Sequence, residues 1–300
     1  MIRLARFLAV ILVAGVLGAP ARPAAAGEAF THGLLWKVER AGLRPSYVFG
    51  TFHTTDPKVL ALPEPVRAAF AAADSVSIEL EITADVQAQL QRAGRARRGL
   101  TLDRLLAPDL LDAVVRKAAE YGLDREQVVA MKPWAVAQLL FGTPPSEQKR
   151  QKAGGPFLDL WLLLEAMRQG KPHYGLESVE EQIAVFNGMP RGVQIGLLRS
   201  ALQNTAEENA FAHMRALYLA RDIGGLEADW NRWLARLEPR DAGVLKARLV
   251  DDRNRRMVRR MAVRLAEGNA FICMGALHLP GETGILRLLA AQGYTVTPVY

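Results

Sequence analysis

Cysteine is nearly absent from this 300-residue chain, which contains only Cys273. A single cysteine excludes an internal disulfide and any metal site built from several thiolates. Aromatic residues make up only 7% of the sequence, which argues against a platform of stacked rings for single-stranded nucleic acid. With 50% hydrophobic and 23% charged residues, the chain is nevertheless typical of a folded globular protein.

Several motifs that identify common enzyme classes are also missing. The sequence has no Gly-x-Ser-x-Gly turn of a serine hydrolase, no His-Glu-x-x-His zinc motif and no Walker phosphate loop. It has no EF-hand calcium loop, and no glycine fingerprint of a dinucleotide-binding fold follows a predicted strand. Any chemistry must therefore come from residues arranged in another pattern.

The amino-terminal region is typical of a secretory signal peptide. Two arginines precede an uncharged run over residues 7–19, and three alanines at 24–26 form an Ala-x-Ala cleavage pattern. The run is shorter than the about 20 residues that a membrane span needs, although an uncleaved anchor is the alternative. No cysteine follows it, so a lipoprotein anchor is excluded. We expect residues 1–26 to be removed and residues 27–300 to be periplasmic or secreted.

The excess of basic residues is small once this segment is set aside. The whole chain has a net charge of +7, but residues 1–26 contain three arginines and no acidic residue, which leaves +4. Such an excess is too weak to indicate a nucleic-acid partner. No later run is long and apolar enough to span a membrane. The sequence does not indicate an oligomeric state.

Strand patterns cluster at both ends of the chain, with one in the middle. Strands are predicted over 34–39, 47–52, 75–82, 171–175, 270–274 and 294–299. The residues between them have mostly helical periodicity, with helical insertions at about 83–155 and 190–250. These patterns predict an α/β fold whose central mixed sheet is built from both ends of the chain.

Two strands end in the same short pattern, Gly-x-x-His. The first pair is Gly50 and His53, and the second is Gly275 and His278. Glycine allows the chain to turn sharply after a strand, and ligands of open α/β sheets bind at the carboxyl ends of strands. We expect the two imidazoles to converge there, although each could instead be a hydrogen-bonded structural histidine.

Acidic residues provide the third element of a possible site. Glu79 and Glu81 share one face of the strand predicted over 75–82, and Glu177 follows another short strand. Two histidines with one carboxylate form a known ligand set for Zn²⁺, Fe²⁺ or Mn²⁺ with open positions for water. Alternatively, the first two acids lie at a solvated edge, and Glu177 favours a helix amino terminus.

These motifs, together with others in a fixed order, resemble the TraB/GumN family, also written TraB/PrgY/GumN. The matching segments are residues 35–38, 49–53, 56–57, 62–63, 77–80, 131–134, 158–159, 175–182, 253–254 and 275–281. The resemblance covers about 33–300 and predicts one family domain over residues 27–300. The family is related to the Tiki metalloproteases and, more distantly, to erythromycin-esterase-like and ChaN-like folds. Glu81 departs from the family's Glu-x-Asp pattern.

The resemblance implies a site and a class of reaction. It implies that His53, Glu79 and His278 are the metal or catalytic set, with a divalent ion such as Zn, Mn, Co or Fe. Asp159 and Asn254 lie in family motifs and are further candidates.

Two functions remain open from the sequence. The first is an exported metal-dependent hydrolase of peptide or amide bonds, with a peptide or small-molecule substrate. In it, an acid that is not a ligand, Glu81 or Glu177, would accept a proton from water, and Arg253 would stabilise the oxyanion. The second is a non-catalytic periplasmic protein that uses the same site to bind haem or a signalling peptide.

Overall fold

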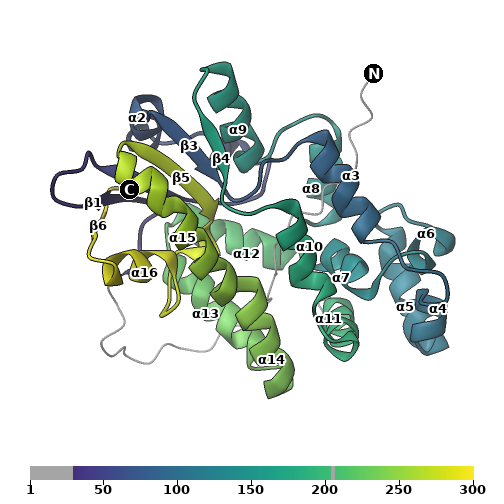
Figure 1. The fold of residues 1–300 in the computed structure, drawn as a ribbon. Helices are drawn as coiled ribbons and strands as arrows, with labels where there is room; N and C mark the ends of the chain where they lie inside the picture. The colour runs from purple at the N-terminus through teal and green to yellow at the C-terminus, as the bar shows by residue number, and fades with distance from the viewer. Residues whose placement is uncertain (1–29, 204–206) are drawn as a thin grey trace. The chain divides into compact units, whose positions relative to one another are not determined.

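The computed structural model describes residues 30–203 and 207–300 (Figure 1). The predicted signal peptide, residues 1–26, lies outside the described residues. The rest forms two compact units, each assembled from separate stretches of chain. The sheet unit contains residues 30–81, 156–178 and 212–300, and the helical unit contains residues 82–155 and 179–211.

The sheet unit contains a six-stranded mixed sheet in the order β4-β3-β5-β2-β1-β6. Its strands are β1 Leu35–Glu39, β2 Ser46–Thr51, β3 Ser75–Ile78, β4 His173–Gly175, β5 Ala270–Gly275 and β6 Thr295–Pro298. Strands β2, β5, β3 and β4 run parallel to one another, whereas β1 is antiparallel to both β2 and β6. The prediction of an α/β fold with a mixed sheet built from both ends of the chain is confirmed.

The centre of this sheet is apolar on both faces. In β5 the side chains of Phe271, Ile272 and Cys273 are fully buried, as expected for a parallel strand that is covered on both sides. The ring of Phe271 lies 5.7 Å from that of Phe49 in β2 and 5.3 Å from that of Phe70 in α2, Glu64–Ala72. The strands that carry the Gly-x-x-His motifs are therefore held by a common aromatic core.

The strand predicted over 75–82 is shorter in the structure, since β3 ends at Ile78. All four of its residues are buried, so the strand does not have one polar face. Glu79 and Glu81 therefore do not share a strand face, and that prediction is wrong. They lie in the segment that leaves the sheet, where a carboxylate can find polar partners that a buried mid-strand position would lack.

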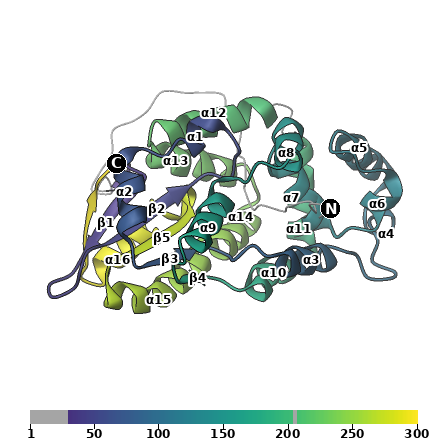
Figure 2. The same cartoon turned by 90° about the horizontal axis from the view of Figure 1, so that it is seen from above.

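Helices of the sheet unit flank these strands and form the connections between them. They are α1 Pro57–Leu60, α2, α9 Leu158–Arg168, α12 Glu207–Leu219 from residue 212 on, α13 Ile223–Leu234, α14 Pro239–Lys246, α15 Asp252–Glu267 and α16 Ile285–Ala291. A π-helical turn, Ala247–Asp251, joins α14 to α15. Helix α15 buries Met257 and Met261 and packs beside α16 (Figure 2).

The helical unit consists of α3 Ala84–Ala93, α4 Leu102–Leu105, α5 Pro108–Ala119, α6 Arg125–Val129, α7 Pro133–Phe141, α8 Pro145–Lys152, α10 Val179–Asn187 and α11 Arg191–Gln203. Helix α7 is buried over almost its whole length and packs against α11. Helices therefore occupy both stretches in which helical insertions are predicted. Among the described residues, no helix combines the length and hydrophobicity needed to cross a membrane.

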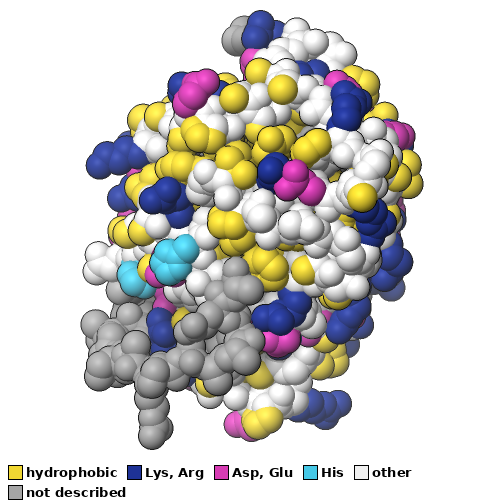
Figure 3. Space-filling view, turned by 90° about the vertical axis from the view of Figure 1, so that its left-hand side faces the viewer, with side chains coloured by type: hydrophobic (Ala, Val, Ile, Leu, Met, Phe, Trp, Pro, Cys, Tyr) yellow, Lys and Arg dark blue, Asp and Glu magenta, His cyan; other side chains and the backbone are white. Residues whose placement is uncertain are grey.

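The face drawn in Figure 3 carries Lys and Arg side chains in several separate places, with Asp and Glu among them.

Candidate functional site

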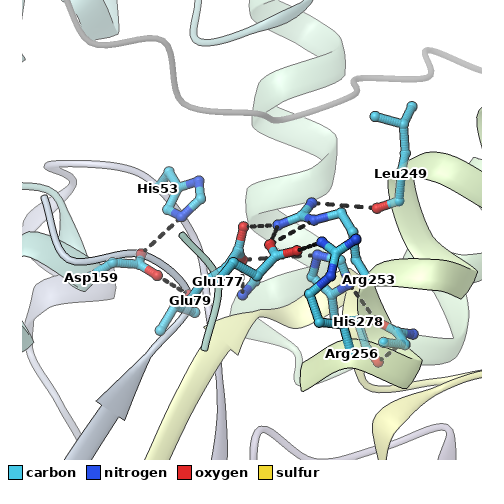
Figure 4. A network of polar contacts seen from close by, with 11 residues as sticks. His53, Glu79, Asp159, Glu177, Leu249, Arg253, Arg256 and His278 are labelled. Carbon is cyan, nitrogen blue, oxygen red and sulfur yellow. Dashed lines mark hydrogen bonds and ion pairs between the residues drawn. The ribbon is translucent and has the colours of Figure 1, made fainter. Parts of the chain in front are cut away.

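Four polar residues follow the carboxyl ends of four parallel strands (Figure 4). His53 follows β2, Glu79 follows β3, Glu177 follows β4, and His278 ends a 3₁₀ turn, Ala276–His278, after β5. Because the carboxyl ends of parallel strands meet at one edge of the sheet, the topology brings these segments together. We call His53, Glu79, Asp159, Glu177, Arg253 and His278 the carboxyl-end cluster.

The two motif glycines have different surroundings. A Cβ added at Gly50 would lie 2.7 Å from Leu279 Cδ1 and 3.1 Å from Ala276 Cα. Gly50 is therefore required because β2 and the turn after β5 approach each other closely. A Cβ added at Gly275 would lie 3.7 Å from both Glu79 Oε2 and His278 Cδ2, which is an ordinary contact distance. Gly275 thus borders the cluster itself.

His278 is buried and faces Glu79. Its Nε2 lies 3.8 Å from Glu79 Oε2, and its Nδ1 lies 2.6 Å from Asn254 Oδ1. The amide nitrogen of Asn254 donates to the carbonyl oxygens of His278 and Thr283, which identifies Oδ1 as the acceptor that faces the ring. His278 Nδ1 therefore carries the proton, and Nε2 presents a lone pair towards Glu79.

His53 is paired with Asp159 rather than with Glu79. The distance from His53 Nε2 to Asp159 Oδ2 is 3.2 Å, and Asp159 Oδ1 accepts a 2.6 Å hydrogen bond from the Thr51 hydroxyl. Asp159 Oδ2 is buried and makes this contact with the imidazole of His53. The ring of Phe157 packs edge-on against His53 at 5.3 Å. Asp159 thus contacts Thr51 through one carboxylate oxygen and His53 through the other.

Arg253 lies between two glutamates and binds both. Its Nε and Nη2 donate to Glu177 Oε2 at 2.8 and 2.6 Å, and Nη2 also donates to Glu79 Oε1. Arg256 Nη1 donates to Glu177 Oε1 at 2.8 Å. Both oxygens of Glu177, whose side chain is 0% exposed, are therefore engaged by guanidinium groups.

Burial and neighbouring charges set the protonation states of the cluster. Burial alone would raise the pKa of Glu79, but the charges of Arg253, His278 and His53 outweigh it and lower that pKa to about 2. Burial and the Arg253 charge lower the pKa of His278 to about 3. Burial opposes protonation of His53, yet Asp159 and Glu79 raise its pKa overall. At neutral pH, Glu79 is ionised and His278 is neutral.

The structure brings most of the predicted site residues together, with three differences. The side chain of Glu81 lies near Gly175 and shares none of the contacts described above. Asp159, a candidate only through the family motif at 158–159, contacts His53 directly. Arg256 was not predicted, although its i,i+3 spacing from Arg253 places both on one helix face.

The chemistry of these donors fits a divalent metal ion. His278 is neutral and has a lone pair on Nε2, and Glu79 is ionised, so both are in the protonation state that binds a metal ion. The described part of the chain does not, however, already gather three or more His, Cys, Asp or Glu side chains in an arrangement that could hold a metal.

Comparison with known proteins identifies relatives over nearly the whole described chain. The model of the TraB/PrgY/gumN family matches residues 34–298. The chain is similar to Metalloprotease TIKI2 of Danio rerio, with 27% identity over 320 residues, 88% of this chain and 60% of the relative. It is also similar to Metalloprotease TIKI1 of Homo sapiens, with 25% identity over 312 residues, 88% of this chain and 61% of the relative.

The chain spans about three fifths of the length of these curated relatives. A Metalloprotease TIKI homolog of Amphimedon queenslandica is 24% identical over 343 residues, which cover 96% of this chain and 66% of the relative. No solved structure matches the chain.

Proposed function

The chain belongs to the TraB/PrgY/gumN family, and from this premise we propose that it is an exported metal-dependent hydrolase of peptide or amide bonds. The observation that carries the proposal is the pairing of a neutral His278, fixed in one tautomer, with an ionised Glu79 in a buried cluster. The relatives named as metalloproteases support the same class of reaction and suggest a peptide as substrate.

In this proposal His53, Glu79 and His278 hold the metal ion, whose identity among Zn, Mn, Co and Fe stays open. A divalent ion with an open position supplies an activated water and polarises the carbonyl of the scissile bond. Asn254 keeps the proton of His278 on Nδ1, so that Nε2 remains a ligand atom. Asp159 contacts Nε2 of His53, so Nδ1 is the nitrogen of this ring that would bind the metal ion.

Arg253 and Glu177 have a positioning role in the same proposal. Arg253 binds Glu79 and keeps it ionised. Glu177 accepts hydrogen bonds from the same guanidinium group and so holds it in place. Because both oxygens of Glu177 already accept hydrogen bonds from arginines, Glu177 is poorly placed to take a proton from water. Asp159 Oδ2, which is buried and contacts the imidazole of His53 instead of a guanidinium group, is the better candidate for that step.

Export is part of the proposal and rests on the sequence of residues 1–26 alone. The uncharged run and the Ala-x-Ala pattern there are typical of a cleaved secretory signal, which would release the protein to the periplasm or the medium.

The test is metal content and cleavage measured on the same preparation. Residues 27–300 are purified, stripped with a chelator, reloaded separately with Zn²⁺, Mn²⁺, Co²⁺ or Fe²⁺, and incubated with a mixed peptide library that is read by mass spectrometry. We expect about one bound ion per chain and cleavage that requires it. Glu79→Gln should lose both, and Glu81→Gln is the matched control that should keep both.

Two outcomes would contradict the proposal in different ways. A folded protein that binds none of the four ions removes the metal site. Stoichiometric metal without cleavage of any peptide favours the alternative of a ligand-binding protein that uses the same cluster.

A further inference from the structure

A hollow in the helical unit is lined by three cationic side chains, Arg97, Lys132 and Arg191. Its volume is about 430 Å³, which is enough for a small organic molecule. None of the nine described residues that line it is acidic. We call this site the basic hollow. It is formed only by residues of the helical unit, whereas the carboxyl-end cluster belongs to the sheet unit.

Lys132 is held in place within the basic hollow. Its Nζ donates a 2.8 Å hydrogen bond to Asn187 Oδ1, and the same oxygen accepts a 3.0 Å bond from the indole of Trp134. The ring of Trp134 is buried and stacks on Phe186, which precedes Asn187 in α10. The ammonium group is thus positioned by a fixed amide oxygen, which carries no compensating charge.

Among the described residues, no acidic side chain neutralises the positive charge of the basic hollow. No carboxylate among the described residues forms an ion pair with Arg97, Lys132 or Arg191, whereas many other arginines of the protein pair with Asp or Glu, such as Arg125 with Asp112. Partial burial and the nearby charge of Arg97 lower the pKa of Lys132, as expected where cations repel each other. A bound anion would relieve this repulsion.

Two further features of the hollow select the kind of anion. Helix α7, nine residues long, begins beside Lys132, and helix α11, thirteen residues long, begins with Arg191, so two positive helix ends add to the side-chain charges. Leu100, Leu105 and Met189 supply apolar surface next to the cations. An oxyanion with an attached apolar body satisfies both parts of the lining.

We propose that the basic hollow binds a small molecule with a phosphate or carboxylate group and an apolar body. Arg97, Lys132 and Arg191 bind the oxyanion, and the leucine and methionine side chains contact the apolar part. This site shares no residue with the proposed hydrolase centre and does not depend on a metal ion.

The experiment is calorimetric titration of residues 27–300 with four probes: phenyl phosphate, phenylacetate, inorganic phosphate and phenol. We expect saturable, salt-sensitive binding of one or both aromatic anions and none of phenol, since the charge anchors the ligand. Inorganic phosphate should bind more weakly than phenyl phosphate because it lacks the apolar part. Whichever aromatic anion binds more tightly identifies the preferred group, phosphate or carboxylate.

Variants test whether the named cations are responsible. Lys132→Gln and Arg191→Gln should each weaken binding by about tenfold or more, since each removes a charge-assisted contact. Arg98→Gln is the matched control, because Arg98 is exposed and does not line the hollow, and it should leave the affinity unchanged. Lys132→Arg keeps the charge, so its affinity should stay within a few fold of the wild-type value. This variant tests the role of the charge even if Lys132→Gln does not fold.

The proposal is overturned if wild-type protein shows no saturable binding of either aromatic anion. It is also overturned if both Lys132→Gln and Arg191→Gln are folded and bind with wild-type affinity. Glu79→Gln should not alter the affinity for these anions, so a failed hydrolase site and a failed basic hollow give different results.

Discussion

At the scale of single residues, the carboxyl-end cluster is dominated by buried charges that depend on one another. Arg253 is 4% exposed at its side chain and lies against Glu79 and Glu177, which are 12% and 0% exposed. A buried ion pair adds little stability over an apolar pair, but removing one partner leaves an uncompensated charge. The cluster is therefore sensitive to loss of its arginine, whatever its chemistry.

Arg253→Ala should lower the free energy of unfolding by about 3–5 kcal/mol, because two buried carboxylates then face each other without their shared cation. Arg259→Ala, an exposed position on the same helix, should change it by no more than about 0.5 kcal/mol. Urea denaturation of both variants measures the difference. Equal stability of the two variants would mean that Arg253 does not hold the glutamates together.

His53→Ala should remove the stabilisation that metal gives to the folded protein. Bound metal at 100 times its Kd stabilises the wild type by about 2.7 kcal/mol, which raises its melting temperature by several degrees. Thermal melts with and without Zn²⁺ or Mn²⁺ should show this rise in the wild type and in His32→Ala, whose imidazole is exposed, but not in His53→Ala. A full metal-induced rise in His53→Ala would exclude this histidine as a ligand.

The sequence indicated the residue types of the cluster better than their partners. The repeated Gly-x-x-His pattern singles out His53 and His278 without any structure. It does not reveal that Asp159 contacts His53, because that pairing joins positions more than a hundred residues apart through the fold. Arg256 is hidden among other arginines of α15, where solvent exposure is the ordinary expectation.

At the scale of secondary-structure elements, the site depends on where strands end. The strands themselves could be predicted from apolar runs bounded by turns, and their predicted ranges agree with β1, β2, β4, β5 and β6 to within two residues. The end of β3 could not be predicted in this way. Apolar and polar residues continue to alternate past Ile78 in the sequence, although the chain leaves the sheet there. Strand order was also beyond the sequence pattern, since it depends on pairing between distant segments.

Gly50→Ala tests the close approach of β2 to the turn after β5. Its methyl group would lie 2.7 Å from Leu279 Cδ1, so we expect overpacking that lowers stability by about 1–3 kcal/mol. Gly275→Ala is the control, because its backbone angles suit alanine and its nearest contacts are 3.7 Å away. Chelator-treated Gly275→Ala should be as stable as the wild type or more so. Equal destabilisation by both substitutions in urea denaturation would contradict this account.

At the scale of the whole molecule, the chain forms two units that each combine separate stretches. The sequence predicted helical insertions at about 83–155 and 190–250, whereas the helical unit is made of residues 82–155 and 179–211, so the second predicted insertion lies partly in the sheet unit. The grouping of the two stretches into one unit emerges only from their packing, such as α7 against α11.

Export makes a prediction about the mature chain as a whole. Intact-mass measurement of the protein recovered from its host should show a chain that begins at Gly27, because cleavage is expected after the Ala-x-Ala pattern that ends at residue 26. Protein that retains residues 1–20 would contradict both cleavage and the proposed release from the membrane.

The division into two units also predicts two separate responses to ligands. All residues of the carboxyl-end cluster belong to the sheet unit, and all residues of the basic hollow belong to the helical unit. A ligand slows amide exchange where it raises the free energy of local opening. Hydrogen exchange read by mass spectrometry should therefore show that Zn²⁺ or Mn²⁺ protects peptides covering 50–54 and 275–279, with little effect on 131–136 and 187–194.

Phenyl phosphate or phenylacetate should produce the opposite pattern, with protection at 131–136 and 187–194 only. The variants separate the two effects further, since His53→Ala should abolish the response to metal and Lys132→Gln the response to the anion, each without altering the other. Protection of both units by one ligand, to the same extent and in the same variants, would contradict two independent sites. It would indicate instead that the two units respond to a ligand as one cooperative structure.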